Sequence, residues 1–174
     1  KNKLVFAPGL LAGTMAANSG RLSVGAKSPL TGGIKESNSG GTAAQRLAKL
    51  GVKALVIEGM PEGDAWYCIH VHKDGVEIKE EQELLGKGNY EVLHRLTSRY
   101  GENTGVITIG PGGEQTLALA NISVKDPKGH IRSAGRGGLG GLAALLGVLL
   151  LFAFLGGLAL GFLQRGGSGG LLVP

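Results

Sequence analysis

Short apolar runs separated by turn residues make up most of the first 140 residues. The runs are three to eight residues long, several alternate between apolar and polar positions, and glycine, proline, asparagine or aspartate stands between them. This pattern predicts strands over 4–7, 21–26, 53–58, 65–72, 76–78, 106–109 and 117–122. Asp74 and Gly75 between two of these runs predict a tight hairpin.

Two segments have the spacing of helices. Residues 43–50 are good helix formers that end at Gly51, and Asn89 is placed to cap a helix over 90–100 that ends at Gly101. Strands outnumber helices, and hairpins are mixed with helical connections. The expected fold class is therefore α+β, with mixed β-sheets and a few helices, rather than a doubly wound parallel sheet.

The pattern changes after Arg136, because no charged residue follows until Arg165. Residues 142–163 are almost wholly apolar, and at about 1.5 Å per residue a helix over them would cross the roughly 30 Å core of a bilayer. We therefore divide the chain into a domain over 1–140 and an apolar tail over 141–174. More basic residues precede the segment than follow it, which would place the domain on the cytoplasmic side of a membrane. The alternatives are a foreign segment and a buried core helix.

Composition narrows the functional classes. The 174 residues include 33 glycines, aromatic residues make up 5%, and the formal net charge is +5. Few aromatics and scattered basic residues do not favour a nucleic-acid partner. Cys68 is the single cysteine of the chain, which excludes an internal disulfide and an all-cysteine metal site.

A polar, glycine-rich turn over 37–42 leads directly into the first predicted helix. The first amides of a helix lack intrahelical partners and lie at the positive end of its dipole, so they favour an anion. Gly40 and Gly41 carry no Cβ that would hold a phosphate at a distance.

A second glycine-rich stretch, over 132–140, contains two arginines. Arg132 and Arg136 lie within five residues of each other, and guanidinium groups bind phosphate oxygens in pairs. We interpret the two stretches as holding one phosphate-bearing cofactor between them.

The ordered set of motifs resembles the N-terminal domain of the aldehyde ferredoxin oxidoreductase family of tungsten enzymes. The resemblance covers roughly the first 140 residues. The matching motifs are NKLVFAPG (2–9), SGR (19–21), KSPLTG (27–32), SNSGG (37–41), IEG (57–59), IGPGGE (109–114) and AGRGGLG (134–140).

The resemblance implies a platform of two mixed sheets for a tungsten ion held by two pterin dithiolenes, with magnesium bridging the pterin phosphates. By resemblance, Arg21 lies between the pterin and an iron–sulfur cluster. Asn38 and Gly40 occupy the first pterin segment, and the backbone carbonyls of Asn38 and Ser133 are magnesium ligands. The second pterin segment contains Arg132, Ser133, Gly135 and Arg136. The family usually has alanine where this chain has Ser133, and a backbone contact would survive that change.

In such a family the whole enzyme is a cytoplasmic oxidoreductase that converts aldehydes to carboxylic acids, with ferredoxin as the acceptor. The segment that usually precedes Asn2, the family's C-x-x-C-x-x-x-C motif for a 4Fe-4S cluster and its substrate domains are missing from this sequence. The chain alone is therefore expected to be inactive. Two alternatives remain open. One is a related tungsten enzyme acting on an aromatic acyl thioester, and the other is a membrane-anchored, non-catalytic module that binds a phosphate ligand.

Other residues carry weaker signals. Residues 135–140 satisfy a dinucleotide fingerprint, but no strand precedes them directly and no acidic residue follows at the usual distance. His70 and His72 share a strand face and could bind a metal, although the sequence shows no third ligand, which favours an exposed hairpin face. Glu58 and Glu114 are interpreted as structural rather than as an acid–base pair, and Cys68 as a buried apolar residue.

Overall fold

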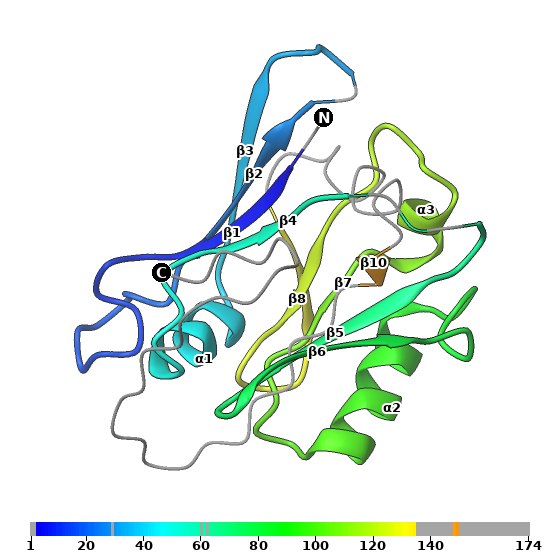
Figure 1. The fold of residues 1–174 in the computed structure, drawn as a ribbon. Helices are drawn as coiled ribbons and strands as arrows, with labels where there is room; N and C mark the ends of the chain where they lie inside the picture. Colours follow the sequence, from blue (N-terminus) through cyan, green and yellow to red (C-terminus); the bar gives the residue numbers. More distant parts are fainter. Residues whose placement is uncertain (1–2, 29, 60, 62, 135–147, 150–174) are drawn as a thin grey trace.

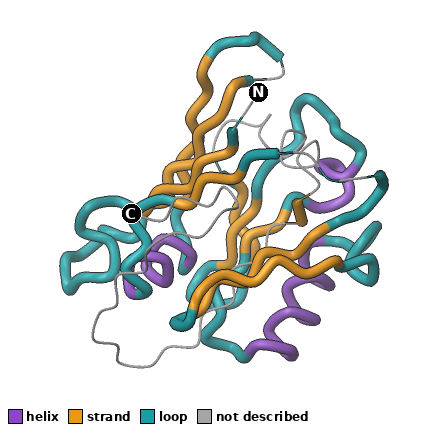
Figure 2. Tube along the Cα trace, viewed as in Figure 1, coloured by secondary structure: helices purple, strands orange, loops and turns teal. Residues whose placement is uncertain are grey.

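The computed structural model describes residues 3–28, 30–59, 61, 63–134 and 148–149, and the following account is confined to them. It contains three sheets and three helices, so the α+β class expected from the sequence is confirmed. Most of the secondary structure is strand, as Figure 2 shows by colour.

The first sheet is antiparallel throughout, in the order β3-β2-β1-β4. Its strands are β1 (Leu4–Pro8), β2 (Leu22–Lys27), β3 (Ile34–Ser39) and β4 (Leu55–Ile57). Alternation along β1 and β2 buries one face of each strand, including Leu4, Phe6, Leu22 and Val24. Helix α1 (Ala43–Lys49) lies near β1 at one end of this sheet, with Leu47 fully buried (Figure 1).

The second sheet is built on the hairpin of β5 (Tyr67–His72) and β6 (Gly75–Glu80). Strand β10 (Val148–Leu149) pairs with β5 in parallel. Helix α2 (Asn89–Tyr100) lies beside the hairpin (Figure 1) and buries Val92, Leu93 and Leu96. The ring of Tyr100 lies 4.4 Å from the ring of His70, which brings the end of α2 against β5.

The third sheet has the order β7-β8-β9 and is also antiparallel. It consists of β7 (Ile107–Thr108), β8 (Ser123–Lys125) and β9 (Ile131–Ser133), and the short helix α3 (Gly110–Glu114) follows β7. Every residue of β8 is buried. The core therefore continues from the first sheet into the third.

The structure corrects three local predictions. Residues 37–39 belong to strand β3 rather than to a turn, because they pair with β2 through Leu22↔Ser39. Residues 117–122 form no strand: Leu117 and Leu119 are exposed, and the strand starts at Ser123. Asn89 lies inside α2, whose N-cap is Gly88.

Tertiary contacts explain the position of Asn89. Its amide nitrogen donates to the hydroxyl of Ser123 (3.4 Å), and its amide oxygen accepts from the hydroxyl of Thr108 (3.3 Å). The side chain therefore joins α2 to β7 and β8 instead of capping its own helix.

Of the apolar segment 142–163, the structure describes only Val148–Leu149, which form β10 and not a helix. The rest of the predicted membrane helix lies outside the described residues. Among the helices that the structure does describe, none is long and apolar enough to cross a membrane.

Candidate functional site

The end of β3 and the start of α1 are attached directly to β8. Thr42 donates its backbone amide and its hydroxyl to the carbonyl oxygen of Lys125, at 2.9 Å and 3.0 Å. Gly41 has φ +112°, and a Cβ at this position would lie 2.7 Å from the same oxygen and 2.9 Å from Val124 Cγ1. Glycine is thus required here both by the backbone conformation and by the closeness of β8.

This contact changes the anion site that the sequence predicts. Ala43 and Ala44, the first two residues of α1, are buried, and the amide of Thr42 is already bonded to β8. The start of the helix therefore packs against protein and does not open to solvent. Gly40 is exposed, and within the described residues no atom lies within 4 Å of the position its Cβ would take. Between the end of β3 and the start of α1, Gly40 is the exposed residue of the predicted phosphate loop.

Strand β9 brings the second predicted segment to the same region. Arg132 pairs with Val124 of β8, and Val124 is the residue against which Gly41 packs. Ser133, the next residue of β9, is paired with Ser123, and the side chains of Arg132 and Ser133 are both exposed. Residues 41–42 and 132–133, which belong to the two glycine-rich stretches, thus both contact strand β8.

Asp126 orients Arg132. Its carboxylate accepts a hydrogen bond from Arg132 Nε at 3.0 Å, and it also accepts the backbone amides of Lys128 and His130, each at 2.8 Å. Burial alone would raise the pKa of this carboxyl group, but the hydrogen bonds from His130, Arg132 and Lys128 lower it to about 2. Asp126 is therefore ionised at neutral pH and holds the guanidinium at β9.

Sequence reasoning missed Asp126, although a signal was present. Asp126, Pro127 and Gly129 occupy the positions of a turn in which an aspartate comes first, proline second and glycine fourth. Such a turn predicts a hairpin between β8 and β9, with the aspartate side chain bonded to the amides that follow.

The start of β2 forms the third part of the region. Arg21 directly precedes Leu22, and Leu22 pairs with Ser39. Arg21 and Gly40 are therefore the neighbouring residues just beyond this paired end of β2 and β3. A Cβ at Gly20 would lie 3.1 Å from Gln45 Nε2 of α1, which brings this segment against the first helical turn. Arg21 is exposed. Ser19 Oγ is buried and has no hydrogen-bond partner among the described residues.

Asn38 is exposed on β3, opposite Ser23 of β2. Its side-chain oxygen accepts from the Ser23 hydroxyl (3.0 Å), and its side-chain nitrogen donates to Glu36 Oε1 (3.1 Å). The side chain is thus held on the surface of the sheet, and a role toward magnesium would fall to the backbone carbonyl. Gly135 and Arg136 lie outside the described residues.

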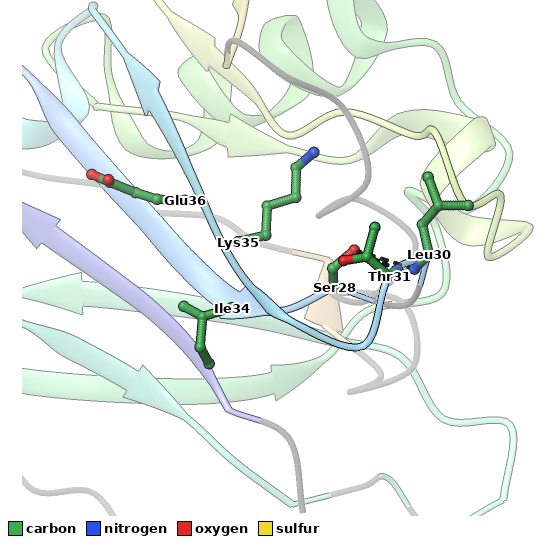
Figure 3. Close-up of a pocket in the computed structure, with 6 residues that line it drawn as sticks. All are labelled: Ser28, Leu30, Thr31, Ile34, Lys35 and Glu36. Atoms are coloured by element: carbon green, nitrogen blue, oxygen red, sulfur yellow. Dashed lines mark hydrogen bonds between the residues drawn. The ribbon is translucent and has the colours of Figure 1, made fainter.

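A hollow of about 260 Å³ lies at the other end of β3, at the tip of the β2–β3 hairpin. Figure 3 shows the residues that line it. Its lining comes from Ser28, Leu30, Thr31, Ile34, Lys35 and Glu36. The Ser28 hydroxyl accepts the amides of Leu30 and Thr31 at 3.2 Å. These bonds shape the loop itself, and none of the predicted site residues lines this hollow.

The two glutamates and the cysteine have structural contacts. Glu58 pairs with Lys3 at 2.7 Å, while Glu114 accepts the amide of Gly86 at 2.8 Å, so the two carboxylates have separate partners. Cys68 is buried, and burial together with the nearby Glu81 raises the pKa of its thiol to about 12. The thiol is therefore not a nucleophile at neutral pH.

The histidine pair differs from the sequence prediction. His70 and His72 lie in β5 with only 12% and 20% of their side chains exposed, so the face is mostly covered. Glu77 of β6 stands directly opposite His70 and supplies the third group that the sequence analysis did not identify. Burial lowers the pKa of His70. The two-residue turn at 73–74 sets the register that places Glu77 opposite His70. The length of this turn was therefore the sequence signal for the third group.

Comparison with known proteins identifies the family to which this domain belongs. Residues 1–148 match the family model described as aldehyde ferredoxin oxidoreductase, N-terminal domain. The chain belongs to this family.

Curated relatives include the tungsten-containing aldehyde ferredoxin oxidoreductases of Pyrococcus abyssi, 38% identical, and of Thermococcus kodakarensis, 40% identical. Each match extends over 141 residues and covers 80% of this chain but 22% of the relative. The chain thus spans about a fifth of the length of the relatives it matches.

A solved structure with a similar fold is the active site complex BamBC of benzoyl coenzyme A reductase in complex with 1,5-dienoyl-CoA. The two structures superpose with a TM-score of 0.74 at 28% sequence identity, over 86% of this chain and 22% of the other. The resemblance stated from the sequence motifs is confirmed.

Proposed function

We propose that this chain is the tungstopterin-binding platform of an enzyme that oxidises aldehydes to carboxylic acids and passes the electrons to ferredoxin. The observation that carries the proposal is the attachment of the Gly40–Thr42 loop to β8, next to Arg132 and Ser133 of β9. The family and its tungsten-containing relatives support the same cofactor class.

The described residues fit a phosphate-bearing group. Gly40 leaves space at its Cβ position, Arg132 offers an exposed guanidinium fixed by Asp126, and Arg21 is exposed beside Gly40. Ser19 Oγ has an unfilled hydrogen-bonding capacity at the same end of β2. Bare backbone and guanidinium groups are the donors that phosphate oxygens prefer.

Each residue has a proposed role. Arg132, Ser133 and Gly40 would hold the pterin phosphates, and Gly135 and Arg136 would extend that segment. The carbonyls of Asn38 and Ser133 would serve magnesium, and Arg21 would lie between the pterin and a 4Fe-4S cluster. The bound metal–pterin group supplies the two-electron redox chemistry, and the protein supplies position and charge.

A chimera tests this proposal. The matching segment of the Thermococcus kodakarensis enzyme is replaced by the corresponding residues of this chain, and tungsten, pterin and aldehyde-dependent dye reduction are measured. We expect about one tungsten and two pterins per chain, and retained activity. Arg132→Ala should lower tungsten and pterin together, whereas Arg95→Ala, an exposed ion-paired arginine of α2, should not. A folded chimera without tungsten, or an Arg132→Ala variant with full content, contradicts the proposal.

A second candidate is a related enzyme that acts on an aromatic acyl thioester, because the benzoyl coenzyme A reductase complex shares the fold of this chain. The same platform would then serve another substrate. To distinguish the two, this chain is also grafted into that reductase and dienoyl-CoA formation is assayed. The proposed function predicts that the chain supports aldehyde oxidation in the Thermococcus chimera better than it supports dienoyl-CoA formation in the reductase chimera.

A further inference from the structure

Two imidazoles and one carboxylate meet on the face of the β5–β6 hairpin that carries His70. His70 and His72 are two residues apart on β5, so both side chains lie on one face of the strand. Glu77 is the cross-strand partner of His70. The cluster is distinct from the region of Gly40 and Arg132, which is formed by other strands.

The distances suit a shared ligand. His70 Nδ1 lies 3.5 Å from Glu77 Oε2, and His72 Nε2 lies 3.8 Å from Glu77 Oε1. One ligand atom from each of the three residues can be chosen such that all lie within 4.8 Å of one another. Ligand atoms about 2.0–2.2 Å from a tetrahedral zinc ion are roughly 3.3–3.6 Å apart. Small rotations of the side chains would therefore close the site.

We propose that His70, His72 and Glu77 bind a divalent first-row metal ion of the zinc class, with water completing the coordination. Imidazole nitrogen with a single carboxylate is a zinc-type donor set, whereas magnesium and calcium prefer oxygen ligands throughout. The ion would join β5 to β6 across the hairpin. This site goes beyond the proposed function and does not depend on it.

Asp74 in the turn provides an outer contact. Its carboxylate lies 3.7 Å from His72 Nδ1, on the side of the ring away from Glu77, and its backbone amide donates to the same nitrogen at 3.3 Å. When Nε2 binds the metal, the ring hydrogen moves to Nδ1, the hydrogen bond from the Asp74 amide to this nitrogen is lost, and the Asp74 carboxylate can accept the ring hydrogen instead. Metal-binding histidines are commonly oriented by a carboxylate in this way.

Packing holds the two rings in place. The His70 and His72 ring centroids are 4.8 Å apart, and Tyr100 of α2 lies against His70. A histidine already restricted by its neighbours loses less side-chain entropy when it binds an ion. The helix thus preorganises one side of the site.

Lys79 competes with the metal. Its ammonium lies 2.7 Å from Glu77 Oε2 on the same strand, and this contact lowers the pKa of Glu77. The ion must displace the ammonium from one carboxylate oxygen, and the two positive charges repel each other. Removal of Lys79 should therefore strengthen metal binding, which a purely structural ion-pair network would not predict.

The test is calorimetric titration of the 174-residue chain with zinc chloride, repeated with magnesium chloride. We expect one zinc per chain, no comparable magnesium binding, and a higher unfolding temperature with zinc. His72→Gln and Glu77→Gln should each weaken zinc binding about tenfold or more. Lys79→Met should tighten it, and His94→Gln, an exposed histidine of α2 outside the cluster, should leave it unchanged.

Circular dichroism without metal verifies that each variant is folded. Where a variant does not fold, cobalt bound to the unaltered chain provides a second readout, because a tetrahedral site with two imidazoles gives strong visible absorption. Absence of stoichiometric zinc binding in the unaltered chain overturns the proposal. Zinc binding by folded His72→Gln and Glu77→Gln at the original affinity overturns it as well.

Discussion

Thr42 and Lys125 are 83 positions apart, yet the backbone amide and the hydroxyl of Thr42 both bond to the carbonyl oxygen of Lys125. These two hydrogen bonds join the end of β3 and the start of α1 to the buried strand β8. Arg132 lies on the next strand, so the contact places Gly40 and Arg132 in one region of the molecule.

The Thr42 hydroxyl contributes to this junction. Thr42→Val removes the hydroxyl donor and leaves the amide bond intact, so we expect a loss of about 1 kcal/mol in the free energy of unfolding. Thr42→Ser keeps the donor and should lose less. Urea unfolding of the three proteins provides the measurement, and equal stability of Thr42→Val and the unaltered chain would show that the hydroxyl bond contributes nothing.

Gly41 is expected to tolerate no side chain. Gly41→Ala brings a methyl group to within 2.7 Å of the Lys125 carbonyl oxygen and leaves alanine at φ +112°, so it should cost about 2–4 kcal/mol. Gly40→Ala is the matched control, because open space surrounds its Cβ position among the described residues. Chemical unfolding measures both. Similar stability of the two variants would argue against the close contact with β8.

Asp126 should make stability depend on pH in the acid range. Its pKa is lowered from 3.8 to about 2 in the folded chain, so its stabilising effect is complete above about pH 4 and is lost as the pH falls toward 2. Asp126→Asn should be less stable at pH 7 and should lose less further stability between pH 4 and 2. Thermal unfolding across this range tests it, and parallel curves for both proteins would refute the assignment.

Cys68 should resist alkylation in the folded chain. Burial and the neighbouring Glu81 raise its thiol pKa to about 12, so almost no thiolate is present at pH 8. Iodoacetamide should modify it slowly in buffer and rapidly in denaturant. Mass spectrometry follows the reaction, and fast native labelling would indicate that the end of β5 opens readily.

Much of the local structure was predictable. The apolar run of β1, the alternation of β2 and β5, and the helix-forming residues of α1 and α2 are patterns of neighbouring residues, and neighbours alone decide them. The prediction for 117–122 was wrong because a run of apolar residues does not reveal whether a partner strand is available. Asn89 was misjudged for a similar reason, since its partners Ser123 and Thr108 come from other elements.

The candidate site divides in the same way. The sequence motifs were sufficient to predict the family, because a family is recognised from residue type and order. The assignment of the glycine-rich segments and the arginines to a cofactor site stays a prediction. The pairing of Glu77 with His70 and the orientation of Arg132 by Asp126 required the register of particular strands.

By itself, the sequence determined the strands β1, β2, β4 and β5, the helices α1 and α2 and the family, because those features depend on side chains close together along the chain. Only the tertiary structure decided that Gly41 and Thr42 close against Lys125 and that the start of α1 is covered. The group they meet is a backbone carbonyl, which every residue possesses, so no residue type in the sequence could reveal it.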